Sequence, residues 1–204
     1  MRTADHVQCI DFPCSEARQE SYMVPDLDLD PSRIKIMLIS ETAPSDPRDY
    51  YYGPCEALFA RTTVRAFQEA GAHISNIQDL LEMGIYLTSA VKCGKYEYAV
   101  ATSTVTHCSA LLEREIGLFP NLSVLLLMGD VAIKAMNAIA KRHAEPRVIP
   151  AGSTYKIRSG QFSYHGMKVF PSYLQAGPSF GIEKSKVTMI AEDLANALRT
   201  AGMA

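Results

Sequence analysis

The sequence lacks an excess of charge of either sign, long apolar runs and internal repeats. Twenty lysine and arginine residues nearly balance 22 aspartate and glutamate residues, so the formal net charge is −2. This balance excludes a strongly basic surface, and any binding to nucleic acid must depend on a local basic face. The longest apolar run, Val124 to Met128, is too short to span a bilayer.

The amino-terminal stretch MRTADHVQCIDFPC contains no apolar segment typical of a signal peptide. We therefore expect a soluble cytoplasmic protein that does not associate with membranes. In that compartment the five cysteines are expected to be thiols or metal ligands and not disulfides. The 204 residues, of which 48% are hydrophobic, suffice for one globular domain.

One stretch organises the rest of the chain. The apolar residues Ile34 to Ile39 predict a buried strand, which Ser40 and Glu41 follow, and then a loop rich in proline, aspartate and tyrosine up to Gly53. Open α/β sheets bind their ligands at such strand ends. The alternative is a solvated turn, and these residues alone leave both interpretations open.

Apolar runs alternate with helical patterns along the chain. The predicted strands are Ile34–Ile39, Ile85–Val91, Leu122–Met128 and a hairpin of Gln161–His165 with Met167–Pro171. The predicted helices run from Pro54 to Gly71, Ile74 to Glu82 with Ser75 as cap, Ser103 to Phe119, Asp130 to Arg142 and Glu183 to Thr200. This order predicts a single α/β domain over residues 1–204, with three α/β/α layers around a mostly parallel sheet of about four strands. Residues 1–33 are expected to form an irregular arm.

Four cysteines form two pairs, Cys9 with Cys14 and Cys93 with Cys108. Packing of a strand on a helix would bring the second pair together, and the arm would supply the first. Such a set suits iron–sulfur or zinc. The alternative is that Cys108 is a small core residue and the others are incidental.

Several segments, in this order and spacing, match one known pattern. They are Cys14–Arg18, Ile36–Glu41, Tyr51–Gly53, Tyr86–Cys93 (YLTSAVKC), Cys108, Leu126–Ala132, Tyr155–Gly160 and Val169–Tyr173. Together they resemble the uracil-DNA glycosylase superfamily, specifically its iron–sulfur branch, often called family 4. The resemblance extends over nearly the whole chain.

The resemblance implies a [4Fe-4S] cluster, with zinc as the alternative. The implied ligands are Cys9, Cys14, Cys93 and Cys108. The wider spacing of Cys9 and Cys14 departs from a tight CxxC pair. Cys55 is expected to pack in its helix, and the cluster is expected to tie the arm to the sheet.

The resemblance also assigns roles near the organising stretch. Glu41 matches the family's motif glutamate, and Asp46 and Asp49 are candidates to hold the attacking water. The alternative for the two aspartates is turn formation beside proline. Tyr51 stands at the position that stacks on a base, and its alternative role is packing of the loop.

Two positions depart from the family pattern. Ser89 replaces the asparagine that reads the uracil edge, and a serine cannot offer the same paired donor and acceptor. Leu174 and Gln175 replace the histidine–proline pair. Leucine donates no hydrogen bond to a developing oxyanion, which typically costs about 2.7–4 kcal/mol of barrier. Gln175 is a candidate for partial replacement.

The segment after these residues resembles the loop with which the family enters the DNA minor groove. The implied DNA-binding residues are Ser172, Phe180 as an apolar wedge, Lys184 and Lys186. The alternative is that Phe180 packs on the closing helix. The local basic face is predicted to comprise Lys92, Lys95, Lys156, Arg158 and Lys184.

The sequence thus predicts a monomeric, DNA-binding uracil-DNA glycosylase-like protein that excises uracil or another damaged base by hydrolysis of the N-glycosidic bond in base excision repair. Two alternatives remain open. One is a catalytically silent nucleic-acid-binding relative that retains the fold, and the other is a protein that acts on a free nucleobase or nucleotide.

Overall fold

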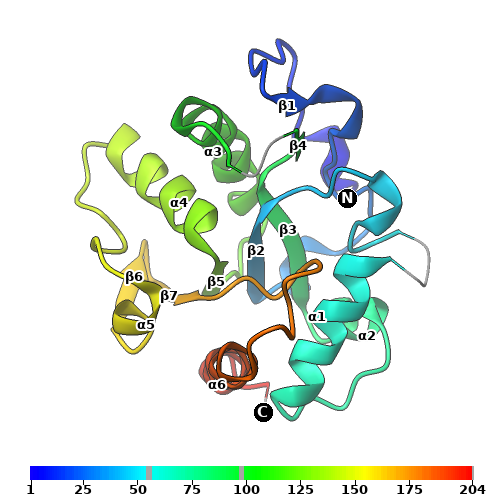
Figure 1. The fold of residues 1–204 in the computed structure, drawn as a ribbon, viewed down its shortest axis with the longest axis vertical. Coiled ribbons are helices and arrows are strands. Elements are labelled where there is room, and N and C mark those ends of the chain that lie inside the picture. The colour runs from blue at the N-terminus through cyan, green and yellow to red at the C-terminus, as the bar shows by residue number, and fades with distance from the viewer. Residues whose placement is uncertain (54–56, 97–98, 204) are drawn as a thin grey trace.

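A five-stranded sheet runs through the centre of the computed structural model, which describes residues 1–53, 57–96 and 99–203 (Figure 1). The strand order is β3-β2-β5-β7-β6, and every pairing is parallel except that of β6 with β7. The strands are β2 (Ile36–Thr42), β3 (Ile85–Val91), β5 (Val124–Met128), β6 (Phe162–Tyr164) and β7 (Met167–Ser172).

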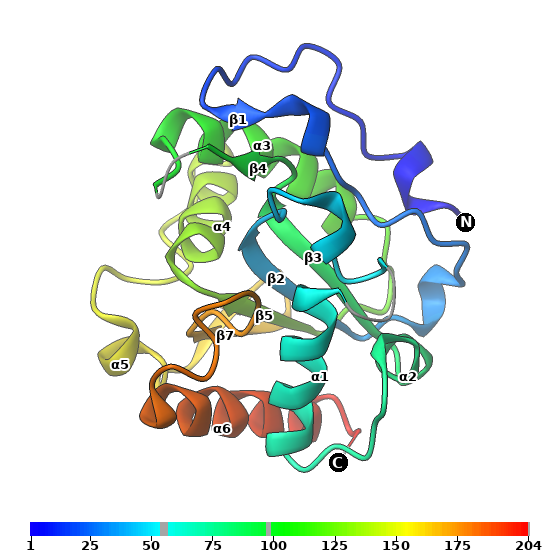
Figure 2. The same cartoon turned by 45° about the vertical axis from the view of Figure 1, so that its right-hand side comes forward.

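Helices cover both faces of this sheet because alternate strand residues bury apolar side chains in opposite directions. Met37 and Ile39 pack toward α3 (Thr102–Ile116) and α4 (Asp130–Arg142). Ile36 and Leu38 pack toward the opposite layer. That layer consists of α1 (Leu58–Glu69), α2 (Ile77–Glu82) and α6 (Lys184–Thr200). Figure 2 shows α1 beside α6 on this face.

The predicted three-layer α/β fold is confirmed. The sheet has five strands instead of about four, because β6 adds an antiparallel partner to four parallel strands. β2 also continues beyond the predicted end at Ile39, since Ser40 and Thr42 still pair with Ser89 and Val91 of β3. The loop before β6 contains one short helix, α5 (Thr154–Ile157).

The amino-terminal arm packs beside the carboxyl end of β3. β1 (Ala17–Arg18) pairs antiparallel with β4 (Gly94–Lys95), and the Met23 N–H donates to the Lys92 carbonyl at 2.7 Å. Three short 3-10 helices complete the arm: Thr3–Asp5, Gln19–Ser21 and Pro31–Arg33. A fourth, Pro47–Asp49, lies in the loop after β2.

β3 lies at an edge of the sheet, and side chains from other segments satisfy part of that edge. The Leu87 N–H donates to the Tyr52 hydroxyl at 2.9 Å. All seven residues of β3 are buried. The edge is therefore covered, although it has no further strand to pair with.

The cap of α2 is Asn76 and not the predicted Ser75. The Asn76 side chain accepts from the Asp79 N–H, and the Asp79 carboxylate accepts from the Asn76 N–H. This reciprocal pair is the stronger cap because it satisfies two free N–H groups at once. The predicted helix start at residues 54–56, including Cys55, lies outside the described residues.

None of the helices in the described part of the chain combines the length and apolarity that crossing a membrane requires.

Candidate functional site

The carboxyl ends of the parallel strands meet at one edge of the sheet, the usual ligand-binding edge of an open α/β fold. β2 brings Glu41 to this edge, β3 brings Ser89, and β7 brings Ser172. β5 leads into α4 through Gly129. The topology thus gathers positions that are far apart in the sequence.

A cavity with about 1010 Å³ of empty volume opens at this edge, and we call it the edge cavity. The residues that matter for its chemistry are Glu41, Asp130, Tyr173, Leu174, Phe180 and Lys186. Four of these six are predicted site residues. Sequence reasoning gave no role to Asp130 and Tyr173, although both lie within the matched segments Leu126–Ala132 and Val169–Tyr173.

Glu41 is half-buried and lies against the start of α4. Its Oε1 accepts a long hydrogen bond of 3.4 Å from the Val131 N–H. Gly129 makes this approach possible, because its φ is +99° and a Cβ there would lie 2.6 Å from Glu41 Oε1. A carboxylate held in this way at the cavity wall can orient a water molecule.

Behind this cavity lies a buried polar network. Gln175 Nε2 donates to the Tyr51 hydroxyl at 3.1 Å and to Thr63 Oγ1 at 3.2 Å. Burial raises the pKa of Tyr51 well above its usual value, which keeps the hydroxyl protonated. The Tyr51 ring is 1% exposed and packs at 5.5 Å from the Phe59 ring, so it has the geometry of the packing alternative.

Two atoms of the candidate base-reading residues lack a partner in the described part of the chain. They are Ser89 Oγ and Gln175 Oε1, and both residues are 0% exposed. A buried polar atom without a hydrogen bond typically costs about 1–3 kcal/mol. These positions are therefore sealed from the edge cavity in this conformation.

Asp46 and Asp49 are held by their own loop. Asp46 accepts from the Arg48 side chain and backbone, and these hydrogen bonds lower the pKa of its carboxyl to about 2. Asp49 Oδ1 accepts from the Leu58 N–H at 3.3 Å, at the start of α1. Neither aspartate lines the edge cavity with Glu41. Their geometry is that of turn and helix-start residues.

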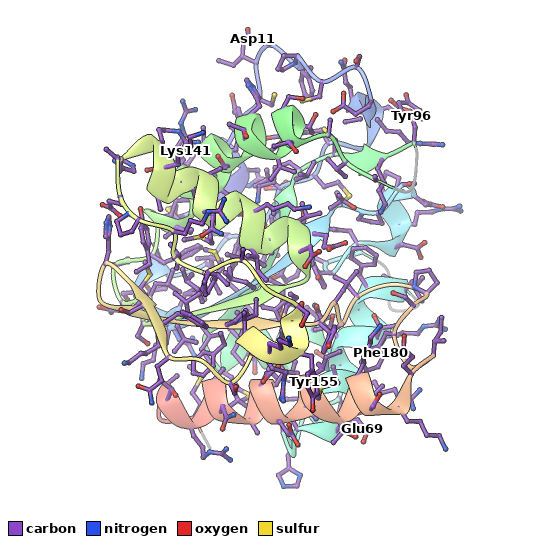
Figure 3. The ribbon with its side chains drawn as sticks, turned by 60° about the vertical axis from the view of Figure 1, so that its left-hand side comes forward. Asp11, Glu69, Tyr96, Lys141, Tyr155 and Phe180 are labelled. Carbon is purple, nitrogen blue, oxygen red and sulfur yellow. The ribbon has the colours of Figure 1, made fainter. Side chains whose placement is uncertain are left out.

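The predicted DNA-binding residues occupy different environments. Phe180 is partly buried near the start of α6 (Figure 3), and the Arg65 guanidinium lies 6.0 Å from the centre of its ring. Lys184 is exposed. Lys186 Nζ bonds to Glu183 at 2.6 Å and lies 5.4 Å from the centre of the Tyr173 ring.

Ser172 is fully buried. Its Oγ donates to Asp193 Oδ2 at 2.6 Å, and Arg158 binds the same carboxylate at 2.8 Å. Burial raises the pKa of Asp193, while the hydrogen bonds from Arg158 and Ser172 oppose that shift. This cluster anchors the end of β7 to α6 and so fixes where the loop of residues 173–183 begins.

The predicted basic face is wrong for two of its five members. Lys92 is 0% exposed and forms an ion pair with Glu115, which is also 0% exposed. Arg158 is largely buried against Asp193 and Glu192. Lys156 and Lys184 are exposed. Sequence reasoning missed the Lys92–Glu115 pair, although Glu115 falls on the apolar face of its predicted helix, which was the available signal.

The four predicted ligand cysteines line one small, largely apolar cavity. Its volume is about 10 Å³, and its lining includes Cys9, Cys14, Cys93 and Cys108. Burial first, and then the neighbouring thiols, raise the pKa of the Cys93 thiol to about 12. Burial likewise raises the pKa of Cys108.

Two cofactors are candidates for this thiol cavity, and they differ in size. Within the described residues, no three histidine, cysteine or acidic side chains converge as the ligands of a single metal ion do. A zinc ion needs its ligand atoms about 2.0–2.3 Å away. A four-iron cluster is larger and accepts thiolates that lie farther apart. The structure thus brings the four predicted ligand cysteines to one cavity, without placing them as the ligands of a single metal ion.

Comparison with known proteins identifies the family. A family model described as the uracil DNA glycosylase superfamily matches residues 28–193. The type-5 uracil-DNA glycosylase of Thermus thermophilus is 29% identical over 90 residues, which are 43% of this chain and 41% of that protein. The aligned part is thus less than half the length of that relative.

Among solved structures, the wild-type UNG crystal structure from Nitratifractor salsuginis gives a TM-score of 0.43 at 13% identity. The match covers 81% of this chain and 75% of the other. The family model itself spans most of the sequence and includes the whole sheet edge described above. On that match, this chain belongs to the uracil DNA glycosylase superfamily.

Proposed function

We propose that this protein binds DNA at the carboxyl edge of the sheet and hydrolyses the N-glycosidic bond of uracil or another damaged base. The observation that carries the proposal is Glu41, a carboxylate that lines the edge cavity and is held at the start of α4. Base excision needs a group that positions or activates water at the sugar C1′. Glu41 has the chemistry and access for that role, whereas Asp46 and Asp49 are engaged elsewhere.

The loop of residues 173–183 would meet the DNA in this proposal. Phe180 is only partly buried, and the adjacent Ile182 is 76% exposed, so apolar groups are available to contact an opened duplex. Lys184 is exposed beside them and can approach a phosphate. The Ser172–Asp193–Arg158 cluster would hold the base of this loop in place.

We also propose that the thiol cavity holds a [4Fe-4S] cluster through Cys9, Cys14, Cys93 and Cys108. The cluster would supply no step of the hydrolysis. Its effect would be structural, because the arm provides two of the thiols while the chain after β3 and α3 provide the others. Binding would also require the two buried thiols, whose pKa values are raised mainly by burial, to lose their protons.

A catalytically silent DNA-binding relative is the second candidate, and one observation favours it. Ser89 and Gln175 are both 0% exposed, and Leu174 is the side chain that reaches the edge cavity instead. The uracil edge then meets no directional donor at these positions. In this case the fold would bind DNA without excising a base.

Single-turnover release of uracil from a labelled oligonucleotide separates the two candidates. The protein should be purified without oxygen and compared with Glu41→Gln, which keeps the size of the side chain but loses the carboxylate that would act on the water. Glu82→Gln is the matched control, because Glu82 is an exposed acid on α2. Base release that is lost only in Glu41→Gln supports the glycosylase. DNA binding without release of any base from uracil-containing or methylated DNA supports the silent relative.

A further inference from the structure

The edge cavity combines carboxylates with aromatic rings. Glu41 and Asp130 line it, and neither forms an ion pair with any residue that the structure describes. The one lysine in the lining, Lys186, is bonded to Glu183, so these two charges offset each other. The lining therefore has an excess of negative charge where a flipped base would enter.

The two rings in this lining already have cations beside them. Lys186 Nζ lies 5.4 Å from the centre of the Tyr173 ring, and the Arg65 guanidinium carbon lies 6.0 Å from that of Phe180. These distances are in the range of cation–π attraction. Both cations are paired with acids of their own, Lys186 with Glu183 and Arg65 with Glu69, so their repulsion of a positively charged aromatic ligand is reduced, while Glu41 and Asp130 would attract it.

Leu174 disfavours a leaving group that becomes negatively charged. It lines the edge cavity and has no group that could donate to an oxyanion, and Gln175 behind it is fully buried. A neutral base such as uracil leaves with a growing negative charge and needs such a donor. A base that is already cationic leaves as a neutral molecule and needs none.

From this combination we infer that the preferred substrate is a purine made cationic by N-alkylation, such as 7-methylguanine or 3-methyladenine in DNA. The inference rests on the proposed glycosylase function and names its substrate class. The edge cavity, with about 1010 Å³ of empty volume, has room for a purine, while the sealed Ser89 and Gln175 positions would not contact it.

The reaction balances without any further reactant. The oxygen of a water molecule bonds to C1′, and one of its protons passes to Glu41 and then to solvent. The bond from C1′ to purine N9 breaks, and its electron pair moves to the base and cancels the positive charge. The products are a neutral alkylpurine, an abasic site with a hydroxyl on C1′, and one released proton.

A neutral isostere gives a direct test. Duplexes that carry 7-methylguanine or 7-methyl-7-deazaguanine have the same shape at the base, but only the first is cationic. Fluorescence anisotropy at one fixed salt concentration should show at least tenfold tighter binding to the cationic duplex. Glu41→Gln and Asp130→Asn should each reduce this ratio severalfold, whereas Glu82→Gln should leave it unchanged. Equal affinity of the native protein for the two duplexes would overturn the inference.

Base release then separates this inference from the proposed function. Release of 7-methylguanine and of uracil is measured in single turnover, each divided by its rate without protein. A larger acceleration for 7-methylguanine supports both the inferred substrate class and the proposed glycosylase function. A larger acceleration for uracil overturns the substrate class and leaves the glycosylase intact, and acceleration of neither base overturns the glycosylase proposal together with the inference.

Discussion

Replacing Lys92 by methionine tests the most deeply buried charge in the molecule. Lys92 and Glu115 are both 0% exposed and form an ion pair. Lys92 Nζ also donates to Thr88 Oγ1 at 2.8 Å and to the Ser89 carbonyl at 2.7 Å. The change removes all three interactions and leaves Glu115 charged in the core, with only the hydroxyls of Tyr86 and Thr88 as donors.

Breaking one side of a buried ion pair typically costs about 3–5 kcal/mol, because the remaining charge stays away from water. For a chain of this length, 1 kcal/mol shifts the melting temperature by roughly 2–4 °C. We therefore expect Lys92→Met to melt about 6–20 °C below the native protein. The double variant Lys92→Met/Glu115→Leu should recover most of this loss, since both charges are gone and the volume remains filled.

The assay is thermal unfolding and urea unfolding followed by far-UV circular dichroism, with Lys92→Met, Glu115→Leu and the double variant measured together. Bound iron is determined in each sample, because Cys93 directly follows Lys92 and loss of a cluster would lower stability by a different route. A Lys92→Met protein within 1 kcal/mol of native would refute the reasoning. So would a double variant no more stable than Lys92→Met.

Three further changes test the site. Leu174→His supplies the missing donor and should speed single-turnover release of uracil by about 100–1000-fold, the equivalent of about 2.7–4 kcal/mol. The control Leu174→Met should not change the rate. An unchanged rate in Leu174→His would mean that the edge cavity does not take uracil. Gly129→Ala should lower the free energy of unfolding by about 1–3 kcal/mol, because φ is +99° and the new Cβ would meet Glu41. Gly71 has a similar φ of +90°, but a Cβ there would meet nothing within 4 Å. The difference between Gly129→Ala and Gly71→Ala in free energy of unfolding, measured in urea, therefore reports the contact of the new Cβ with Glu41. Equal losses in the two variants would contradict that contact. Cys93→Ser should abolish most of the iron bound after anaerobic reconstitution, and iron content equal to native would count against the proposed cluster.

The strands were predictable where a mainly apolar run has clear ends. Ile85–Val91 is β3 to the residue, because Gly84 stops the preceding helix and Lys92 ends the apolar run. β2 was predicted too short, since Ser40 and Glu41 look like loop residues. Their place in the strand depends on pairing with β3, which lies almost fifty residues farther along the chain.

Charged residues were the main source of error at the site. Lys92 and Arg158 were predicted on a basic surface, yet both are held inside by acidic partners that lie 23 and 35 residues away in the sequence. Single-sequence patterns carry no information on such pairs, because burial of a charge is decided by whether a partner from another element reaches it. The gathering of Glu41, Leu174 and Phe180 around one cavity followed from the family resemblance together with the parallel sheet.

The arm lies beside the end of a strand that would be prone to aggregate if its edge were uncovered. The seven buried residues of β3, IYLTSAV, are strongly β-prone and carry no charge. Backbone contacts hold the arm beside the carboxyl end of this strand, where the Met23 N–H donates to the Lys92 carbonyl and β1 pairs with β4. If the thiol cavity anchors this arm, oxidation or loss of its metal would free the arm and uncover unpaired N–H and C=O groups on an apolar strand. Molecules damaged in this way would pair through their exposed β3 edges and aggregate before the rest of the domain unfolds.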